Sequence, residues 1–440
     1  MTKHLSKELR GFGLFLVFIA LFFYAAPAQA PVVIVTPPDD AASRRLASFE
    51  KVWKTVNDRH FDPTFGGVDW GKIRLKYEPV TKRAASDEEL HNILRQMLNE
   101  LKLSHFGIHP MNLTAEQVNR ETGYVGIDII MIDGEPVVNR VDPGSPGDRA
   151  GVRKGFVISR IDAEKASEIL IAYEKTLVGR ALTEQSRKVY LERHLETRIN
   201  GKPGSTVSLE FIGGNRMIQQ TTITREEFKG EMSRPFGNFP AQQVHFESRS
   251  IAPDIVYVRF NMWVMPQLAK LRNAVRDLST VSGLVIDLRG NPGGIGAMAP
   301  SLAGYLVSEK ASLGTMRTRE RSIQFLVYPQ INPFRGKVVI LTDHGTASTS
   351  EVFAAGMRDI GRATLIGGVS SGAVLPSVFE TLPTGALFQY AISDYRTPKD
   401  QPLEGAGVSP DIAVDQATEA LLAGRDAQLE RAVEFIRFSR

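Results

Sequence analysis

Residues 337–357 carry the feature that most constrains the fold. An apolar run of β-forming residues at 337–342 predicts a buried strand, and apolar residues at helical spacing after the polar turn predict a helix. The turn presents Ser348 beside the N–H groups of a helix N-terminus, where unpaired donors and the helix dipole stabilise negative charge. A plain helix cap at Ser348 or Ser350 explains the same turn, so two interpretations stay open.

Strand and helix patterns alternate over the whole of residues 240–415, which predicts an α/β core with a mostly parallel sheet. One strand, at 284–288, ends in a turn that contains Gly293 and Gly294. In such sheets, sites lie at the carboxyl ends of the strands. We therefore expect this glycine turn and the Ser348 turn to lie at the same edge. Residues 416–440 are expected to form a C-terminal helix.

Residues 42–110 form an N-terminal helical region. Apolar residues recur at i, i+3 and i+4 spacing in its first part, and a capping box at Ser86 and Glu89 predicts a second helix. Ser104 and His105 follow the exit of that helix. A lone histidine in such a place is usually a capping or surface residue, so His105 depends on partners elsewhere in the chain.

The chain begins with the pattern of an export signal. Three basic residues precede an apolar run at 11–26, and small residues follow it, so residues 1–28 are expected to be a signal peptide or an N-terminal anchor. A Pro-rich linker is expected at 29–41. With such a signal we expect the protein to be exported to the periplasm or the extracellular space. If the apolar run at 11–26 is not cleaved off, it would associate the protein with a membrane.

Composition excludes several kinds of chemistry. The chain has no cysteine, which excludes disulfides, thiolate metal sites and a cysteine nucleophile. A net charge of +4 over 440 residues, without a dense basic patch, gives no reason to expect nucleic acid as a partner. The sequence predicts neither a metal site nor a cofactor. Its length suggests two or three domains.

Residues 120–215 form a separate β-rich block. A Gly-led turn enters a strand at 123–129, a second strand follows, and residues 142–152 form a turn and a short helix. The block closely resembles a PDZ domain, although Phe156 stands where such domains usually carry Asp. A helical stretch at 176–195 is longer than a compact PDZ domain requires, and we expect it to be an insertion.

The PDZ resemblance implies a groove in which a peptide C-terminus or an extended strand adds to the sheet edge. Its loop would be formed by Tyr124, Val125, Gly126 and Ile127. The alternative is a β-rich spacer that binds no ligand.

Acyl transfer needs a nucleophile, a base, a group that orients the base, and donors for the oxyanion. Ser348 is the candidate nucleophile, and the N–H groups of Gly293, Gly294 and Thr349 are candidate oxyanion donors. The eight histidines give a short list of bases. His344 is close in sequence to Ser348, but its ring would have to turn back past Gly345, so His105 is preferred.

Several motifs together are similar to the C-terminal processing peptidase family of serine peptidases, over about residues 45–414. The motifs are Phe49-Glu50-Lys51-Val52-Trp53, Phe61-Asp62-Pro63, Gly67-Val68-Asp69-Trp70, Ser104-His105, the PDZ-like block, 286–294, 345–351 and 405–411. The resemblance implies a multidomain α/β protein with an inserted PDZ-like domain and a ClpP/crotonase-like catalytic core. It also implies that Ser348 is the nucleophile.

The family divides by its base, and Ala373 stands where the Ser–Lys type carries its lysine. An alanine cannot accept a proton. The sequence instead resembles the branch of the tricorn core protease, which uses a Ser–His pair before the PDZ domain and a later Glu. This resemblance implies His105 as general base, Ser104 as its hydroxyl partner and Glu404 as part of the orienting network.

The expected function is that of a secreted or periplasmic serine endopeptidase acting on protein or peptide substrates. One alternative is a peptide-binding protein on a degenerate peptidase scaffold. Another is that Lys399, from a different loop, replaces the missing lysine. Homo-oligomerisation stays open, as do substrate specificity and the peptide ligand.

Overall fold

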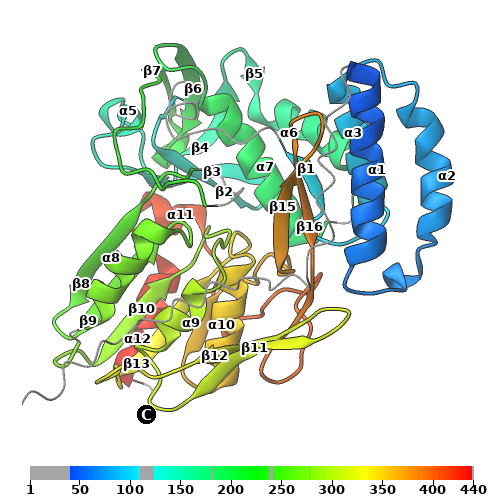
Figure 1. Ribbon diagram of the computed structural model, residues 1–440. Helices are drawn as coiled ribbons and strands as arrows, with labels where there is room; N and C mark the ends of the chain where they lie inside the picture. Colours follow the sequence, from blue (N-terminus) through cyan, green and yellow to red (C-terminus); the bar gives the residue numbers. More distant parts are fainter. Residues whose placement is uncertain (1–39, 110–122, 181, 237–240, 277, 439–440) are drawn as a thin grey trace, which may run out of the picture. The chain divides into compact units, whose positions relative to one another are not determined.

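The structure is a computed structural model, and it describes residues 40–109, 123–180, 182–236, 241–276 and 278–438 (Figure 1). The expected signal peptide and nearly all of the expected linker lie outside these ranges. Across the described ranges, every helix is too short or too polar to cross a membrane.

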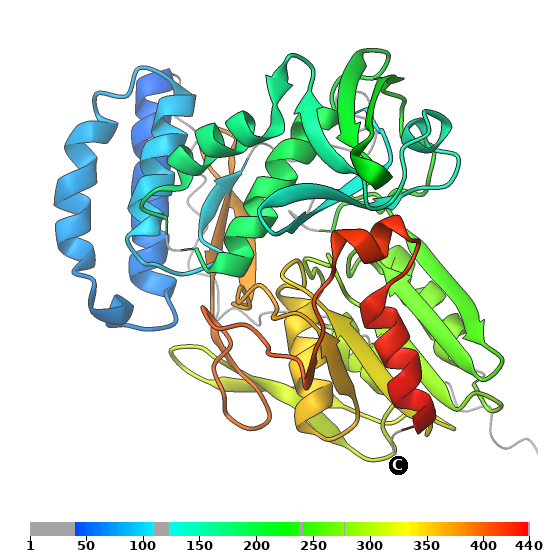
Figure 2. The same ribbon diagram turned by 180° about the vertical axis from the view of Figure 1, so that it is seen from behind.

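Three helices open the described chain and lie side by side in both views (Figures 1 and 2): α1 (Ala41–Arg59), α2 (Trp70–Thr81) and α3 (Asp87–Asn99). Asp40 caps α1 by accepting a 2.8 Å hydrogen bond from the Ser43 N–H, so the helix begins inside the expected linker. The predicted capping box is confirmed, because the Glu89 N–H donates to Ser86 Oγ at 3.1 Å. The Glu89 carboxylate reaches back to the N–H of Ala85 at 2.8 Å.

The apolar faces of these helices pack against a small sheet that the sequence patterns did not predict. Its order is β1-β16-β15, formed by β1 (Gly107–His109), β16 (Leu387–Ala391) and β15 (Ser377–Thr381). Phe49, Leu94 and Phe388 are fully buried in the shared core. Strand β1 begins two residues after His105, so its antiparallel pairing with β16 anchors the segment that carries the candidate base.

A second sheet has the order β2-β3-β4-β6-β7, with antiparallel pairing throughout and β5 on the side of β4. Its strands are β2 (Ile127–Ile132), β3 (Glu135–Val141), β4 (Val157–Ile161), β5 (Glu164–Lys165), β6 (Thr206–Ile212) and β7 (Ile218–Thr224). Its helices are α5 (Pro146–Arg149), α6 (Ala166–Leu177) and α7 (Glu184–Ile199). The prediction of one helix over 176–195 was wrong, because α6 and α7 are separate helices.

The central sheet has the order β18-β14-β13-β10-β9-β8 and is parallel except for β8, which confirms the predicted α/β core. Its strands are β8 (Phe246–Ala252), β9 (Ile255–Phe260), β10 (Gly283–Asp287), β13 (Lys337–Thr342), β14 (Thr364–Gly367) and β18 (Ile412–Ala413). Strands β10 and β13 are buried along almost their whole length, as expected for a sheet covered on both faces.

Helices cover both faces of this sheet (Figures 1 and 2). Helices α8 (Met265–Arg276), α9 (Met298–Ala303) and α10 (Thr349–Asp359) share one apolar cluster with the sheet, and α12 (Ala427–Phe438) contributes to the cluster on the other face. The single C-terminal helix expected over 416–440 is instead two helices, α11 (Thr418–Leu422) and α12. Gly424, with φ of 73°, lies in the turn between them.

A fourth sheet with the order β12-β11-β17 completes the described strands. It consists of β11 (Ala311–Arg317), β12 (Ser322–Val327) and β17 (Asp394–Arg396), all antiparallel. Leu313 and Val327 of this sheet are buried in the main cluster with α10. Short 3-10 turns at Phe65–Gly67 and Gly214–Arg216 complete the helical elements named here.

The packing of the N-terminal helices on β16 can be tested at Phe388, whose side chain is fully buried. We expect Phe388→Ala to lower the free energy of unfolding by about 3–5 kcal/mol, because the substitution removes a buried ring and leaves a cavity. Chemical denaturation followed by tryptophan fluorescence measures this change. Leu75→Ala on α2, where the side chain is 72% exposed, is the control and should change stability by no more than about 0.5 kcal/mol. Equal effects of the two substitutions would contradict the described packing.

Candidate active site

Ser348 lies between β13 and α10, at the N-cap of the helix, in an unusual backbone conformation. Its φ is 54° and its ψ is −120°, which for a residue with a Cβ stores about 1–3 kcal/mol of strain. Strained strand-to-helix turns of this kind expose a nucleophilic hydroxyl. The Ser348 N–H donates to Ala373 O at 2.8 Å and to Glu351 Oε2 at 3.0 Å. Ser350 Oγ instead accepts from Trp263 Nε1 at 2.8 Å, so Ser350 is not the cap.

The turn of residues 343–348 is called the nucleophile turn below, after the candidate nucleophile Ser348. The Glu351 carboxylate holds this turn against the loop of residues 370–374. Besides Ser348, it accepts hydrogen bonds from Ser370 Oγ at 2.6 Å, from the Gly372 N–H at 2.8 Å and from the Ala373 N–H at 3.1 Å. Burial raises the pKa of Glu351 to about 7, although these hydrogen bonds act in the opposite direction. Sequence reasoning missed this role. The spacing Ser348-x-x-Glu351, which is that of a capping box, was the signal that could have revealed it.

The glycine turn after β10 lies against Ser348. The two turns therefore meet at the same edge of the sheet, as predicted. A Cβ on Gly293 would lie 2.7 Å from Ser348 Cβ, and a Cβ on Gly294 would lie 2.3 Å from Trp263 O. Both glycines have positive φ, at 94° and 137°. No other residue fits this close approach of two backbones.

The three expected oxyanion donors are not equivalent. The Gly293 N–H donates to Asn291 Oδ1 at 3.0 Å and is therefore engaged. Within the described residues, the N–H groups of Gly294 and Thr349 donate to no acceptor. Thr349 Oγ1 donates to Gly294 O at 2.9 Å, which holds the two segments together. Gly294 and Thr349 thus have the free donors.

His105 follows α3 and is joined to Glu404 through Ser104. Ser104 Oγ lies 2.7 Å from His105 Nδ1 and donates to Glu404 Oε2 at 2.9 Å. The Ser104 N–H donates to Glu404 Oε1 at 2.7 Å. Because the Ser104 proton points to Glu404, Ser104 Oγ must accept from His105 Nδ1–H. The network therefore assigns the proton to Nδ1 and leaves Nε2 free to accept one.

Burial is the main influence on the titration of this group. Burial, with a smaller contribution from the charge of His109, lowers the pKa of His105 to about 4. Burial also raises the pKa of Glu404, although the bonds from Ser104 and Val374 oppose the shift. His105 is consequently neutral at pH 7, as a general base must be.

Residues 373 and 374 link the two halves of the site. Ala373 O accepts from the Ser348 N–H, while the neighbouring Val374 N–H donates to Glu404 Oε2 at 3.1 Å. Ala373, at the position of the missing lysine, is thus next to the nucleophile turn. Among the described residues, no hydrogen bond joins Ser348 to His105.

The other candidate bases have different partners. His344 Nε2 lies 2.6 Å from Glu192 Oε1 of helix α7. Among the described residues, no hydrogen bond joins His344 to Ser348. Lys399 is exposed, and its N–H donates to Asp359 Oδ2 at 3.4 Å. His109 has the i, i+4 spacing from His105 found in many zinc sites, which sequence reasoning overlooked. Its Nε2 lies 2.9 Å from Gln389 Oε1, and no described group of three His, Asp or Glu side chains is placed to hold a metal ion.

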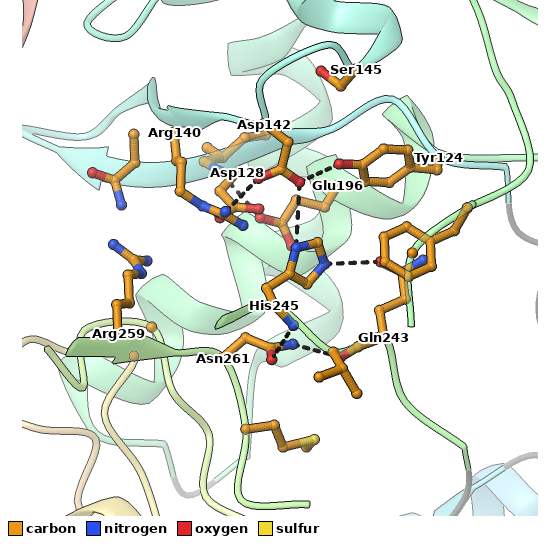
Figure 3. Close-up of a pocket in the computed structure, with 18 of the residues that line it drawn as sticks. Tyr124, Asp128, Arg140, Asp142, Ser145, Glu196, Gln243, His245, Arg259 and Asn261 are labelled. Carbon is orange, nitrogen blue, oxygen red and sulfur yellow. Dashed lines mark hydrogen bonds and ion pairs between the residues drawn. The ribbon is translucent and has the colours of Figure 1, made fainter. Parts of the chain in front are cut away.

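A cavity of about 1100 Å³ lies over the carboxyl ends of β9, β10 and β13. Its floor includes Asn261, Gly290 and His344, and residues of the second sheet and of α7 form its other walls. Figure 3 shows the charged groups on those walls. Arg140 pairs with Asp128 at 2.7 Å and also with Asp142, which accepts from the Tyr124 hydroxyl. The lining includes Gly290, Pro292 and residues 343–345 beside the Ser348 turn, but neither Ser348 nor His105.

The expected PDZ-like loop is partly occupied by bonds within the protein. The Tyr124 N–H donates to Glu226 O at 2.6 Å, and the Val125 N–H donates to Asn200 Oδ1 at 3.3 Å. Gly126 has φ of 78°, and a Cβ there would lie 2.3 Å from Ser145 Cβ. Ile127 is the first residue of β2. The four residues thus lead into the edge strand, while their role in ligand binding stays a prediction.

Comparisons with known proteins show what the chain is similar to. Residues 254–414 match peptidase family S41, and residues 42–99 match the tricorn protease C1 domain. The chain is 26% identical over 390 residues to the chloroplastic C-terminal processing peptidase of Tetradesmus obliquus, covering 86% of this chain and 79% of that protein.

Two solved structures share the fold. The photosystem II D1 C-terminal processing protease has a TM-score of 0.57 and 21% identity, covering 90% of this chain and 98% of that one. The tricorn protease has a TM-score of 0.52 and 18% identity, covering 90% of this chain and 37% of that one. At such identities the likeness establishes the fold alone.

The close approach of the two turns can be tested at Gly293. We expect Gly293→Ala to destabilise the protein by about 1–3 kcal/mol more than Gly290→Ala, because its methyl group has no room. Gly290 is a matched control, since it lies in the same turn with φ of 70° and a Cβ added to it would meet nothing within 4 Å. Both substitutions add similar backbone strain. Urea denaturation measures the difference, and equal midpoints would show that the turn is not packed as described.

Proposed function

We propose that this serine-type peptidase, whose residues 254–414 form a peptidase family S41 domain, is an exported endopeptidase with Ser348 as nucleophile and His105 as general base. The hydrogen-bond chain from Glu404 through Ser104 to His105 carries this proposal. It favours the tautomer in which Nε2 is free to accept a proton, which is what a general base requires.

In the proposed reaction, His105 Nε2 takes the proton of Ser348 Oγ as the oxygen attacks the peptide carbonyl. Ser104 Oγ and the Glu404 carboxylate stabilise the imidazolium that forms. The N–H groups of Gly294 and Thr349, at the N-terminus of α10, bind the oxyanion. His105 then gives the proton to the leaving amine, and water hydrolyses the acyl-enzyme. Attack requires His105 Nε2 within hydrogen-bond distance of Ser348 Oγ, and a conformational step can supply that contact, as gating steps do in many enzymes.

The substrate is proposed to be an extended polypeptide. The cavity over the carboxyl ends of the central strands has paired charges on its walls, and the edge of β2 borders it through Asp128, Ile129 and Ile130. The groove between β2 and α7 is the site proposed for a peptide that adds as a strand. The export signal expected at 1–28 supports the proposal that the enzyme acts in the periplasm or outside the cell.

Reaction with a fluorophosphonate probe tests the two catalytic roles. We expect Ser348→Ala to abolish labelling and His105→Ala to slow it by about 10³- to 10⁶-fold, since both residues act as one unit. Ser301→Ala is a control, because Ser301 is exposed on α9. An unlabelled wild type would favour the peptide-binding protein. Labelling that survives in Ser348→Ala would show that the nucleophile lies elsewhere.

The pH dependence of labelling identifies the base. With the pKa of His105 lowered to about 4, protonation removes the base only below that pH. We therefore expect the labelling rate to rise as pH increases through about 4 and to stay level to pH 7. A rise between pH 6 and 7 would indicate a histidine with an ordinary pKa, and a rise only above about pH 8 would indicate a lysine such as Lys399. Either result would contradict the assignment of His105 as the base.

A further inference from the structure

The candidate base lies in a short stretch, residues 104–107, which we call the base segment. His105 has φ of 58°, in the left-handed region that a residue with a Cβ adopts only when its surroundings determine it. Its neighbours supply part of that determination, since Ser104 before it is bonded to Glu404 and strand β1 follows it. A third support acts on Phe106, the residue between the base and β1.

This support is the ring of His60, at the end of α1. The rings of His60 and Phe106 are nearly parallel, at 19°, with their centroids 5.6 Å apart, within the range of favourable aromatic contacts. The His60 ring also stacks on Phe61 at 4.6 Å and lies 5.2 Å from the ring of Phe65. His60 is only 1% exposed. It therefore belongs to a buried group of aromatic rings, one of which is part of the base segment.

The His60 ring contributes packing and not proton transfer. Its Nδ1 lies 2.8 Å from Asp62 O and 3.1 Å from Asp62 N, which ties the ring to the Phe61-Asp62-Pro63 motif. Within the described residues, its buried Nε2 has no hydrogen-bond partner. Burial lowers the pKa of His60, so the ring is neutral at pH 7. A neutral ring with no second partner relays no proton, and its faces make the contact with the base segment.

The end of α1 is held from the core by the hairpin of β11 and β12 (Figures 1 and 2). Arg319, in the turn of that hairpin, donates to His60 O and, at 2.9 Å, to Asn57 O. A cation at the last carbonyls of a helix is stabilising because it complements the helix dipole. The same hairpin packs closely on α10, since a Cβ on Gly356 would lie 2.7 Å from Leu313 Cβ. The hairpin thus connects the end of α1 to the helix that carries the candidate nucleophile.

We propose that His60 is a positioning residue for His105: its ring, held by the turn after α1 and by Arg319, fixes Phe106 and with it the place of the imidazole relative to α10. The inference rests on the proposed role of His105 as base. Displacing a reacting group by about 1 Å can lower a rate by about 100-fold. Loss of the stack should therefore slow the reaction although every reacting group is still present.

The test uses the full chain and measures the rate of Ser348 labelling by a fluorophosphonate. We expect His60→Ala to slow labelling by about 10- to 100-fold, because the base segment loses a support. His60→Phe keeps an aromatic ring against Phe106 and gives up only the bond to Asp62, so its rate should stay within about threefold of the wild type. Arg319→Ala, at an exposed position, should slow labelling by about 2- to 5-fold.

A double substitution separates positioning from general damage to the fold. In a His105→Ala background there is no base to position, so adding His60→Ala should slow labelling no further. A substitution that merely loosened the fold would slow labelling in both backgrounds. The matched control is His91→Ala on α3, which removes an imidazole bonded at 3.1 Å to the Thr384 hydroxyl in the same helical region. We expect this control to be labelled at the wild-type rate.

An NMR titration of His105 reads the same contact without catalysis. In protein that carries ¹³C-labelled histidine, the His105 signal is the one missing from His105→Ala. Burial holds the pKa of His105 at about 4. A loosened base segment would expose the ring to water, so in His60→Ala this pKa should rise toward about 6.5. In His60→Phe it should stay near the wild-type value.

The outcomes separate the positioning role from the proposed peptidase. Labelling of His60→Ala at the wild-type rate, or an equal loss in both backgrounds, would overturn the positioning role while leaving the peptidase intact. If His60→Ala does not fold, Arg319→Ala decides through the same comparison of backgrounds. A wild type without Ser348-dependent labelling would overturn the peptidase. The titration would then decide, because an unchanged pKa of His105 in His60→Ala would show that His60 does not hold the base segment.

Discussion

The buried carboxylate of Glu351 is the interaction on which the rest of the site depends. Its two oxygens accept from the backbone of the nucleophile turn and from the backbone and a hydroxyl of the loop at 370–374. A buried carboxylate is unfavourable unless such donors surround it, so the two segments stabilise it only when they lie together. The strained backbone of Ser348 persists because this surrounding structure determines it from several sides.

The loop at 370–374 also contacts the carboxylate that orients the candidate base. Ala373 contacts the nucleophile turn and Val374 contacts Glu404, so a single peptide unit connects the two halves of the site. A lysine at position 373 would bring its own amine to the serine. With alanine there, a proton acceptor has to come from another part of the chain, and His105 is the residue proposed here for that role. The β1–β16 pairing then sets the position of that segment against the core.

Local patterns predicted the elements whose signals are local. The apolar run before Ser348, the capping box at Ser86 and the parallel core follow from periodicity and turn chemistry. The roles of Ser104, His105 and Glu404 came from resemblance, because no pattern within either segment reveals a contact across the chain. The β1-β16-β15 sheet was missed for the same reason, since β1 has only three residues. The hydrogen bonds from the Ile129 and Met131 N–H groups of β2 to Glu196 and Glu192 of α7 were also beyond prediction, because glutamates on a helix usually face solvent.

The bond between Ser104 and Glu404 spans 300 positions of sequence. The carboxylate that orients the candidate base is therefore supplied from near the far end of the described chain. Contacts between residues so distant in sequence are slow to form, because a long loop must close first. A chain that has not yet brought these two segments together has no oriented imidazole at His105.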